Sequence, residues 1–168
     1  MIKYCDNFLT ETELKSLKEI MPGLTYTLEH YSPAHPGDLH NFQFVHYIVK
    51  NGKVVSPYFS LFENLFLDKL NITECQRMMV CVNASTHKVL ENGYHKDWFD
   101  VRENDIMNSA IFYFNTCDGY TAITTKKGKT KKIESVENRI SIFPAHWLHT
   151  GTTTSNSQVR TVLNIVYR

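Results

Sequence analysis

The spacing of apolar and polar residues predicts two helices in the first part of the chain. Thr10 with Glu13 three residues later is a capping-box pattern, so a helix begins there. Apolar residues follow at helical spacing until Pro22 ends the run. A second apolar stripe with a helical period covers 58–70, where it predicts a helix that faces the core.

The pattern changes to short β-type segments after residue 71. The predicted strands there are rich in β-branched and aromatic residues, and turn residues separate them: 76–83, 109–115, 120–125, 132–136, 139–143 and 159–167. One earlier strand is predicted at 41–50, before a turn at 51–52, whereas 24–39 is interpreted as irregular or loosely paired. Strands at this spacing predict an all-β sandwich or barrel that follows a mostly helical first third.

Composition and charge narrow the class of protein. With 168 residues, 42% hydrophobic and 21% charged, the chain is typical of one soluble globular domain. The formal net charge of +1 offers no electrostatic argument for nucleic acid or a membrane surface. Its four cysteines are scattered without a C-x-x-C, which disfavours a zinc ribbon or a disulfide framework. No signal peptide or membrane-length apolar run is recognisable, so we expect a reduced, cytoplasmic protein.

Two further polar features have ordinary interpretations. The lysine-rich stretch 125–132 favours a solvated hairpin turn with Gly128 at its tip over an anion-binding finger, because no aromatic residues interleave the lysines. Several histidines lie before or within the predicted strand 41–50 and either line a substrate cleft or are exposed: His30, His35, His40 and His46.

A histidine and an aspartate stand two residues apart in GYHKDWF. In a strand, side chains at i and i+2 project from the same face, so His95 and Asp97 converge while Lys96 faces away. Taken alone, the pattern favours a surface His–Asp pair, or a buried histidine oriented by its neighbour, over a functional site.

The C-terminal strand VRTVLNIVY has a polar face and an apolar face. Arg160 and Asn164 share one face with Val162, and the alternate positions are mostly apolar. A buried arginine needs an anion to compensate for its lost hydration, and a carboxylate matches its planar fork. The strand therefore predicts a polar ligand inside a β-barrel, beside Arg160.

The two features combine with a later histidine into one set of metal ligands. His95, Asp97 and His149 are two histidines and one carboxylate, the set that is diagnostic of non-haem Fe(II) oxygenases. Such a set leaves coordination positions open for a chelating cosubstrate and dioxygen. Arg160, on the strand after His149, is placed to hold the far carboxylate of that cosubstrate.

These motifs occur in a specific order. GYHKDW is followed by IFYFN, DGYTAIT and ENRISIFPAHWLHTGTT, and the last of these contains R-x-x-x-F-x-x-x-x-x-H-x-G. VRTVLNIVY, with an arginine at its head, comes last, and DNFLTETE lies near the N-terminus, from residue 6. From about Met78 to Tyr167 the sequence resembles the 2-oxoglutarate- and Fe(II)-dependent dioxygenases, particularly the prolyl-4-hydroxylase-like group.

The resemblance implies an α+β, mainly β fold with a double-stranded β-helix core, the cupin-like jelly roll, and N-terminal supporting helices. It implies a single domain over 1–168, in which 1–72 supplies mostly helical support and loops and 73–168 supplies the jelly-roll core. The cofactors would be Fe(II), 2-oxoglutarate as cosubstrate and O2.

The resemblance also implies residue roles. His95, Asp97 and His149 would be the Fe(II) ligands, and Arg160 would bind the C5 carboxylate of 2-oxoglutarate. The glycine two residues beyond His149 selects it over His146, which we interpret as a strand-end or surface residue. Three further residues are candidates for cosubstrate binding or support: Tyr113 through its hydroxyl, Asn83 by its place before the H-x-D motif, and Asn164 on periodicity.

The implied reaction hydroxylates a substrate C–H bond and releases succinate and CO2. The substrate would be a residue of a peptide or protein, with proline as one candidate, or a small metabolite or nucleobase; nucleic acid is disfavoured by the charge. Two other classes stay open: a catalytically silent ligand-binding module, and a hydrolytic or isomerising Zn or Mn enzyme. Neither of these needs Arg160.

Overall fold

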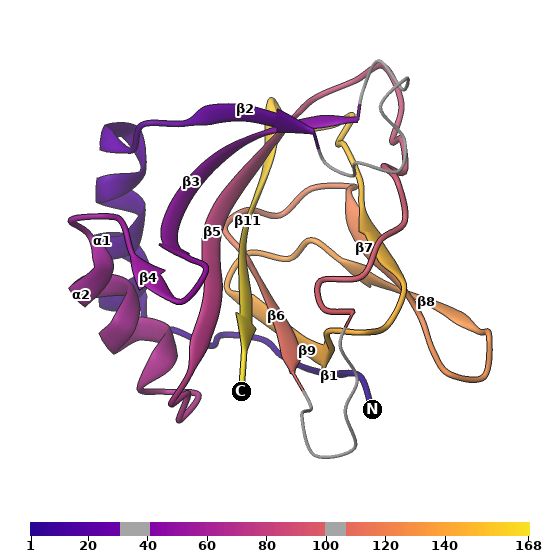
Figure 1. Ribbon diagram of the computed structural model, residues 1–168. Helices are drawn as coiled ribbons and strands as arrows, with labels where there is room; N and C mark the ends of the chain where they lie inside the picture. The colour runs from indigo at the N-terminus through magenta and orange to yellow at the C-terminus, as the bar shows by residue number, and fades with distance from the viewer. Residues whose placement is uncertain (31–40, 100–106) are drawn as a thin grey trace.

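The computed structural model describes residues 1–30, 41–99 and 107–168 of this mainly β protein (Figure 1). The described strands are β1 (Lys3–Cys5), β2 (Thr27–His30), β3 (Phe42–Lys50), β4 (Lys53–Val54), β5 (Cys75–Ala84), β6 (Asn108–Tyr113), β7 (Tyr120–Thr124), β8 (Thr130–Glu134), β9 (Arg139–Pro144), β10 (His149–Gly151) and β11 (Val159–Tyr167). The helices are α1 (Glu11–Ile20) and α2 (Phe59–Phe62).

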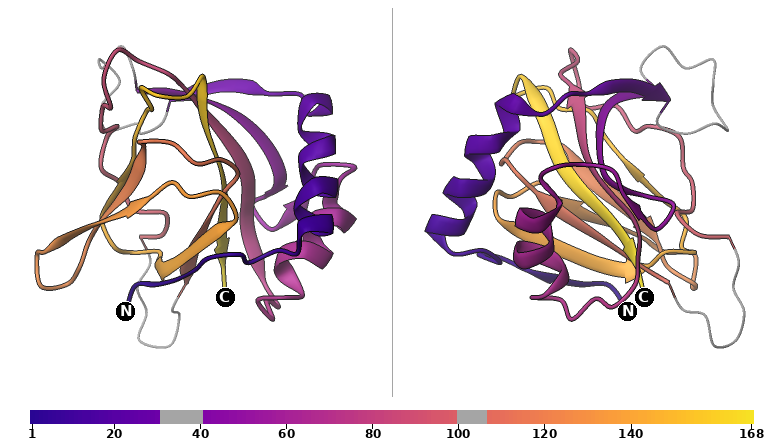
Figure 2. Two further views of the ribbon diagram at one scale, coloured as in Figure 1. Left: turned by 180° about the vertical axis from the view of Figure 1, so that it is seen from behind. Right: turned by 60° about the vertical axis from the view of Figure 1, so that its left-hand side comes forward.

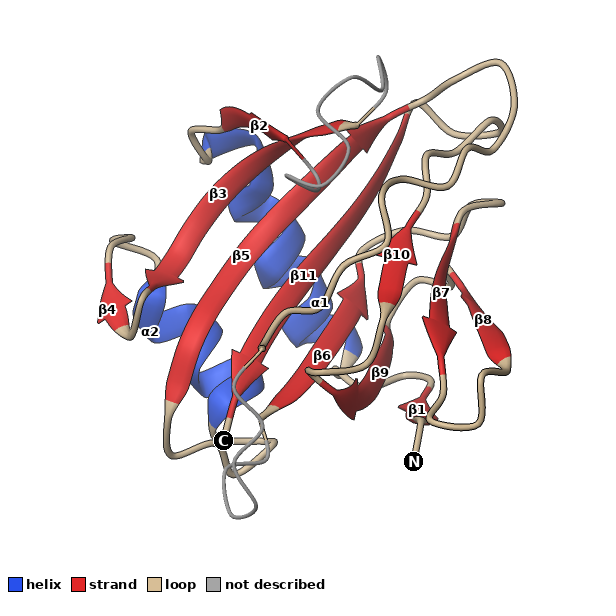
Figure 3. Cartoon of the chain, turned by 45° about the vertical axis from the view of Figure 1, so that its right-hand side comes forward, coloured by secondary structure: helices blue, strands red, loops and turns tan. Residues whose placement is uncertain are grey.

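Two antiparallel sheets face each other. The large sheet has eight described strands in the order β1-β9-β6-β11-β5-β3-β2, with β4 beside β3, and the small sheet has the order β10-β7-β8. Both helices lie against the outer face of the large sheet, and the small sheet lies over its inner face (Figures 1 and 3). This arrangement confirms the predicted jelly roll with N-terminal supporting helices.

The predicted capping box begins α1. The Glu13 backbone N–H donates to Thr10 Oγ1 at 3.3 Å, and Glu13 Oε2 accepts from the Thr10 backbone N–H at 2.8 Å. These two bonds satisfy N–H groups that a helix start leaves without partners. No helix in the described parts of the chain is long and apolar enough to cross a membrane.

The predicted helix over 58–70 is present but irregular. It consists of α2 followed by a π-helical turn, Glu63–Leu67, so three successive residues at its end are buried: Leu65, Phe66 and Leu67. Phe66 packs edge-on against Phe112 of β6, with ring centroids 5.1 Å apart. The apolar stripe was therefore a correct indication of burial, and the wider turn brings more consecutive side chains inward than an α-helix would.

The alternation along β11 separates two cores. Leu163 and Ile165 pack under the helices, whereas Val162 packs between the two sheets. Arg160 and Asn164 alternate with the helix-facing residues and line the cavity between the sheets. The predicted polar face of this strand thus points away from the helices, which cover the other side of the large sheet in Figure 2.

The first third of the chain contributes strands to the large sheet in addition to its helices. β3 pairs along β5, and β2 extends the sheet beyond β3 where irregular or loosely paired structure was predicted. β1 pairs with β9, although all three of its residues are exposed. Such edge strands form by backbone pairing without burial, so they carry no hydrophobic periodicity. His35 and His40 lie outside the described residues.

The lysine-rich stretch forms the predicted hairpin between β7 and β8. Gly128 adopts a φ of +74° at its tip, and the Gly128 backbone N–H donates to the Thr125 carbonyl at 2.9 Å. A Cβ on Gly128 would meet no atom within 4 Å among the described residues. Gly128 is therefore needed for the positive φ of the turn, and packing against the described residues sets no limit on a side chain at this position.

Candidate metal and ligand site

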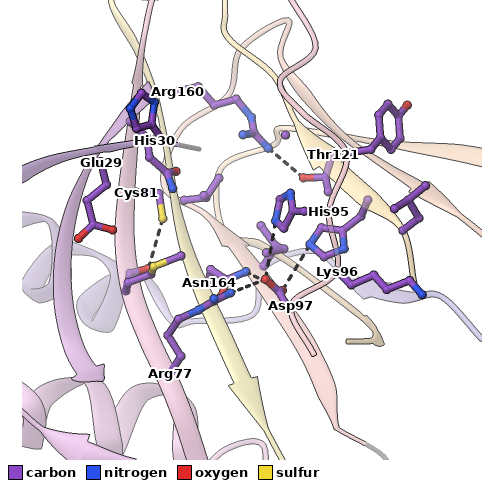
Figure 4. A pocket seen from close by; sticks show the side chains of 18 of the residues that line it. Glu29, His30, Arg77, Cys81, His95, Lys96, Asp97, Thr121, Arg160 and Asn164 are labelled. Carbon is purple, nitrogen blue, oxygen red and sulfur yellow. Dashed lines mark hydrogen bonds and ion pairs between the residues drawn. The ribbon is translucent and has the colours of Figure 1, made fainter. Parts of the chain in front are cut away.

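A cavity of about 610 Å³ lies between the two sheets. It is lined by His95, Asp97, His149, Arg160 and Asn164, together with residues of β2, β3 and β5. Figure 4 shows the carboxylate of Asp97 close to His95, with Arg160 at the far side of the space. The cavity thus collects the two features that the sequence singled out.

Backbone pairing brings the two histidines together. The His95 backbone N–H donates to the His149 carbonyl at 2.9 Å, and the His149 N–H returns the bond at 2.9 Å. The Asp97 backbone N–H then donates to the Ala145 carbonyl at 3.0 Å. The segment around His95 is therefore extended and runs beside β10. Lys96 is exposed and directed away from Asp97 (Figure 4). This is the i, i+2 geometry that the sequence predicted.

The two imidazole rings are oriented by backbone carbonyls. His95 Nδ1 lies 3.1 Å from the Gly93 carbonyl oxygen, and His149 Nδ1 lies 2.8 Å from that of Trp147. A carbonyl oxygen only accepts, so each Nδ1 carries the proton and each neutral ring presents its Nε2 lone pair. One donor atom each from His95, Asp97 and His149 lies within 4.8 Å of the others.

The protonation states suit metal binding. Burial, followed by the neighbouring His149, lowers the pKa of His95 to about 4, so its ring is neutral at pH 7. Burial opposes ionisation of Asp97, but Arg77 and then the two histidines hold the pKa of this carboxyl well below its usual value. A neutral His95 imidazole and an Asp97 carboxylate are therefore present near neutral pH.

One contact in this group favours a bound cation. His149 Nε2 is buried without a hydrogen-bond partner and lies 3.3 Å from Asp97 Oδ2. With the His149 proton on Nδ1, two lone pairs face each other at that distance, which is unfavourable unless a positive charge lies beside them. The residues therefore fit a divalent transition-metal ion, which two imidazoles and a carboxylate bind with positions left open.

Three side chains hold the carboxylate of Asp97. Arg77 Nη2 donates to Asp97 Oδ1, Ser109 Oγ donates to Oδ2 at 2.6 Å, and Asn164 Nδ2 donates to Oδ2 at 3.2 Å. Arg77 Nη2 also donates to Asn164 Oδ1 at 3.1 Å, so the arginine and the amide fix each other. The Asp97 side chain is fully buried, and these donors set its orientation before any metal arrives.

Arg160 lies at the other end of the cavity without a carboxylate partner. Its Nε donates to Ser135 Oγ at 2.7 Å, and its Nη2 donates to Thr121 Oγ1 at 2.9 Å. It is 1% exposed, and no carboxylate among the described residues pairs with it. A Cβ on Gly119 would stand 2.6 Å from Arg160 Cδ, so only glycine fits against this side chain. A buried guanidinium bonded only to hydroxyls is a site for an anion.

The other predicted residues lie around these two ends. Asn164 lines the cavity and contacts Asp97, as described above. Tyr113 is buried behind Thr121, and its hydroxyl donates to Thr121 Oγ1 at 2.9 Å. Asn83 is paired in register with Arg160, and its Oδ1 accepts from Asn92 Nδ2 at 3.4 Å. His146 is half-buried and outside the cavity lining. Direct cosubstrate contacts by Tyr113 and Asn83 stay predictions.

Sequence reasoning missed four residues that complete the site: Arg77, Ser109, Thr121 and Ser135. Arg77 carried a detectable signal, because it is a lone arginine in the apolar strand CQRMMVCVN, as Arg160 is in VRTVLNIVY. It alternates with Met79 and Cys81 on the face that lines the cavity. The hydroxyl residues carried no such signal, since serine and threonine are common in strands and turns.

Comparison with known proteins identifies the fold. A scan of protein-family models finds no match to this chain, and no curated protein matches it either. Solved structures do match over 99% of the chain. An oxidoreductase of the 2OG-Fe(II) oxygenase family from Burkholderia pseudomallei is 15% identical, with a TM-score of 0.74 over 84% of that protein.

Two other structures illustrate the range of these neighbours. A prolyl hydroxylase in complex with a hypoxia inducible factor oxygen degradation domain peptide, from Trichoplax adhaerens, is 13% identical, with a TM-score of 0.67, and the match covers 99% of this chain and 82% of that one. HygX from Streptomyces hygroscopicus, with nickel, 2-oxoglutarate and hygromycin B bound, is 10% identical, with a TM-score of 0.62 over the same shares. The chain therefore has the fold of 2-oxoglutarate- and Fe(II)-dependent oxygenases.

Proposed function

We propose that this chain is an Fe(II)- and 2-oxoglutarate-dependent dioxygenase that hydroxylates a C–H bond of its substrate. The observation that carries the proposal is the presence, in one cavity, of a two-histidine, one-carboxylate set and of a buried arginine without a carboxylate partner among the described residues. A metal site alone fits many reactions. The added anion site selects chemistry that uses a metal together with an acidic cosubstrate.

Each group has named residues to bind it. His95, Asp97 and His149 would hold Fe(II), and Arg160 would pair with the distal carboxylate of 2-oxoglutarate. When bound, iron, cosubstrate and O2 supply the oxidation, in which 2-oxoglutarate becomes succinate and CO2 and one oxygen atom enters a substrate C–H bond.

Thr121 assists the anion site. Its Oγ1 accepts hydrogen bonds from both Arg160 Nη2 and the Tyr113 hydroxyl, each at 2.9 Å. With both donors directed at this oxygen, the Thr121 proton is left to donate to a third group, and Thr121 lines the cavity. Tyr113 thus acts on the cosubstrate through Thr121, and the carboxylate receives a hydroxyl donor beside the guanidinium.

The remaining side chains keep the metal site in one state. Arg77, Ser109 and Asn164 hold Asp97 ionised and oriented. The backbone carbonyls that contact Nδ1 of His95 and of His149 leave the Nε2 of each ring to face Asp97. Preorganised ligands bind a metal without a rearrangement at the moment of binding.

The substrate class follows less directly from the fold. The matched prolyl hydroxylase is bound to a peptide, whereas HygX is bound to hygromycin B, so the shared fold accommodates both kinds of ligand. We propose a peptide or protein residue, or a small molecule, as the substrate, and the cytoplasm as the location. A silent binding module or a Zn or Mn hydrolase would give neither succinate formation nor a dependence on Arg160.

Reconstitution with Fe(II) and 2-oxoglutarate tests the proposal. We expect succinate to form in air, and to form faster with a suitable substrate. The variants Asp97→Ala and His149→Ala should lose iron binding in a direct metal titration, whereas Arg160→Ala should retain iron and require a higher 2-oxoglutarate concentration.

His146→Ala is the matched control for His149, because it is the neighbouring histidine outside the cavity. Loss of iron binding in His146→Ala together with full binding in His149→Ala would refute the ligand assignment. Unchanged cosubstrate affinity in Arg160→Ala would refute the anion site.

A further inference from the structure

The cavity extends beyond the metal and anion sites to the edge of the large sheet. Glu29 of β2 and Gln43 of β3 are cross-strand partners, and both line the cavity together with Tyr47 of β3. We refer to these three residues as the edge wall. Neither the metal ligands nor Arg160 belongs to it, so the edge wall is available to the substrate.

Glu29 supplies a negative charge to the edge wall. Among the described cavity-lining residues, the only carboxylates are those of Glu29 and Asp97, and Asp97 is committed to Arg77 and the metal site. Glu29 Oε2 accepts a hydrogen bond from the Tyr47 hydroxyl at 2.9 Å, which fixes the carboxylate. Burial, then this bond, raises the pKa of Tyr47 to about 12, so the phenol remains a donor. Glu29 Oε1 lies 3.9 Å from Lys50 Nζ, beyond hydrogen-bond distance.

Gln43 supplies an acceptor that has no donor. Its side chain is 6% exposed, and its Oε1 is buried without a hydrogen-bond partner among the described residues. Buried polar atoms are normally paired, so an unpaired amide oxygen in the wall of a cavity marks a place where a ligand donor belongs.

The cations near the edge wall do not neutralise it fully. Arg77 is paired with Asp97, and Arg160 lies at the cosubstrate end of the cavity. Lys50 is half-exposed, and its Nζ lies 4.1 Å from the Tyr47 ring centroid as well as 3.9 Å from Glu29. The aromatic ring and the carboxylate thus already attract one ammonium group, and exposed ion pairs of this kind are weak enough for a ligand to displace.

We infer that the substrate carries an ammonium or guanidinium group, which donates hydrogen bonds to Glu29 Oε1 and Gln43 Oε1 in place of Lys50. The inference rests on the proposed function for the oxidation itself and adds the chemical class of the molecule oxidised. Glu29, Gln43 and the metal ligands line the same cavity but come from different segments of the chain. The positive group and the oxidised carbon are therefore different parts of the substrate. A free basic amino acid, a basic side chain of a peptide and an amino sugar all have this chemistry.

Binding under anaerobic conditions tests the inference. The protein loaded with Fe(II) and 2-oxoglutarate is titrated calorimetrically with L-lysine, a lysine-containing pentapeptide and glucosamine. Each is compared with a neutral counterpart: L-norleucine, the norleucine pentapeptide and N-acetylglucosamine. We expect at least one cationic probe to bind roughly tenfold or more tighter than its counterpart. The probe that does so identifies the source of the cation.

Two variants distinguish a substrate site from a surface ion pair. Glu29→Gln should abolish the preference for the cationic probe, whereas Lys50→Met should strengthen binding of that probe, because a competing ammonium has been removed. A purely structural Glu29–Lys50 pair predicts the same small loss of stability from both variants and an unchanged preference. That result, or no saturable binding of any cationic probe to the loaded protein, overturns the inference.

Gln43→Met provides a second test with its own signs. If Gln43 Oε1 is an acceptor for a ligand donor, the variant raises the thermal midpoint of the free protein, because a buried unpaired oxygen is removed. It also lowers the affinity for the cationic probe. If Gln43→Met changes neither the affinity for the cationic probe nor the preference over its neutral counterpart, the inference is contradicted. Failure of Fe(II) and 2-oxoglutarate to bind in the loading step is a separate outcome, which refutes the proposed function before any probe is added.

Discussion

Two arginines on neighbouring strands face the same cavity, but only one has a carboxylate partner. Arg77 of β5 donates to Asp97, whereas Arg160 of β11 donates to the hydroxyls of Ser135 and Thr121. Arg160 is nevertheless the more buried, at 1% exposed against 29% for the Arg77 side chain. The difference shows which charge the chain neutralises itself and which charge it leaves for a ligand.

The comparison predicts different changes in unfolding free energy when each arginine is replaced in the free protein. Arg77→Met leaves the carboxylate of Asp97 buried without its cation, so we expect the metal-free protein to lose about 3 kcal/mol of unfolding free energy. Arg160→Met removes a buried cation that has no counter-charge, so we expect a change within about 1 kcal/mol. Chemical denaturation of both metal-free variants measures this. An equal loss in both would show that the chain neutralises Arg160 as well.

The packing of Arg160 gives the next largest effect. A Cβ on Gly119 would stand 2.6 Å from Arg160 Cδ and 2.8 Å from the Thr153 carbonyl oxygen. Gly119→Ala should therefore cost about 2 kcal/mol of stability and weaken 2-oxoglutarate binding, because the guanidinium is displaced. Gly23→Ala is the control, since its Cβ would meet only the Tyr58 hydroxyl, at 3.3 Å. Similar losses in both variants would remove the link between Gly119 and the anion site.

A smaller loss of stability is expected from removing one of the hydroxyl groups that Arg160 contacts in the absence of a carboxylate partner. Thr121→Val leaves Arg160 Nη2 and the Tyr113 hydroxyl without their shared acceptor, at a cost of about 1.5 kcal/mol. It should also weaken 2-oxoglutarate binding, whereas Thr121→Ser keeps the oxygen and should restore most of both. Calorimetry with 2-oxoglutarate in the metal-loaded variants checks this. Equal affinity in the valine and serine variants would contradict a hydroxyl donor at the anion site.

The same comparison shows what the sequence could predict. Arg160 could be recognised because an arginine interrupts an otherwise apolar strand, and His149 because glycine follows it in a specific motif. His95 and Asp97 converge because extended backbone repeats every two residues. These indications are local, so one sequence suffices for them.

The partners of those residues depend on contacts between distant segments. Asp97 meets Arg77 only because the segment that carries Asp97 lies over β5, and Thr121 reaches Arg160 only because the small sheet lies over the large one. The exposed edge strands β1 and β2 were missed for a related reason, since pairing with β9 and β3 forms them without burial. The jelly roll was predictable from motif order, whereas its electrostatic pairings required the three-dimensional arrangement.

The smallest expected effect concerns the loop that supports Arg160. Asp118, beside Gly119, accepts hydrogen bonds from the Ser155 hydroxyl, the Ser155 backbone N–H at 2.9 Å and Thr154 Oγ1 at 2.7 Å. These bonds, led by the Ser155 hydroxyl, lower the pKa of Asp118 to about 2. Because the folded-state pKa is depressed, the stabilisation is complete above the unfolded-state value near 4 and is lost as the pH falls through about 2. Asp118→Asn should therefore lower the thermal midpoint slightly at pH 7 and by clearly less at pH 2, where the folded carboxyl is about half protonated. A difference of the same size at pH 2 as at pH 7 would assign the effect to loop shape, and the charge of Asp118 would then have no part in supporting Arg160.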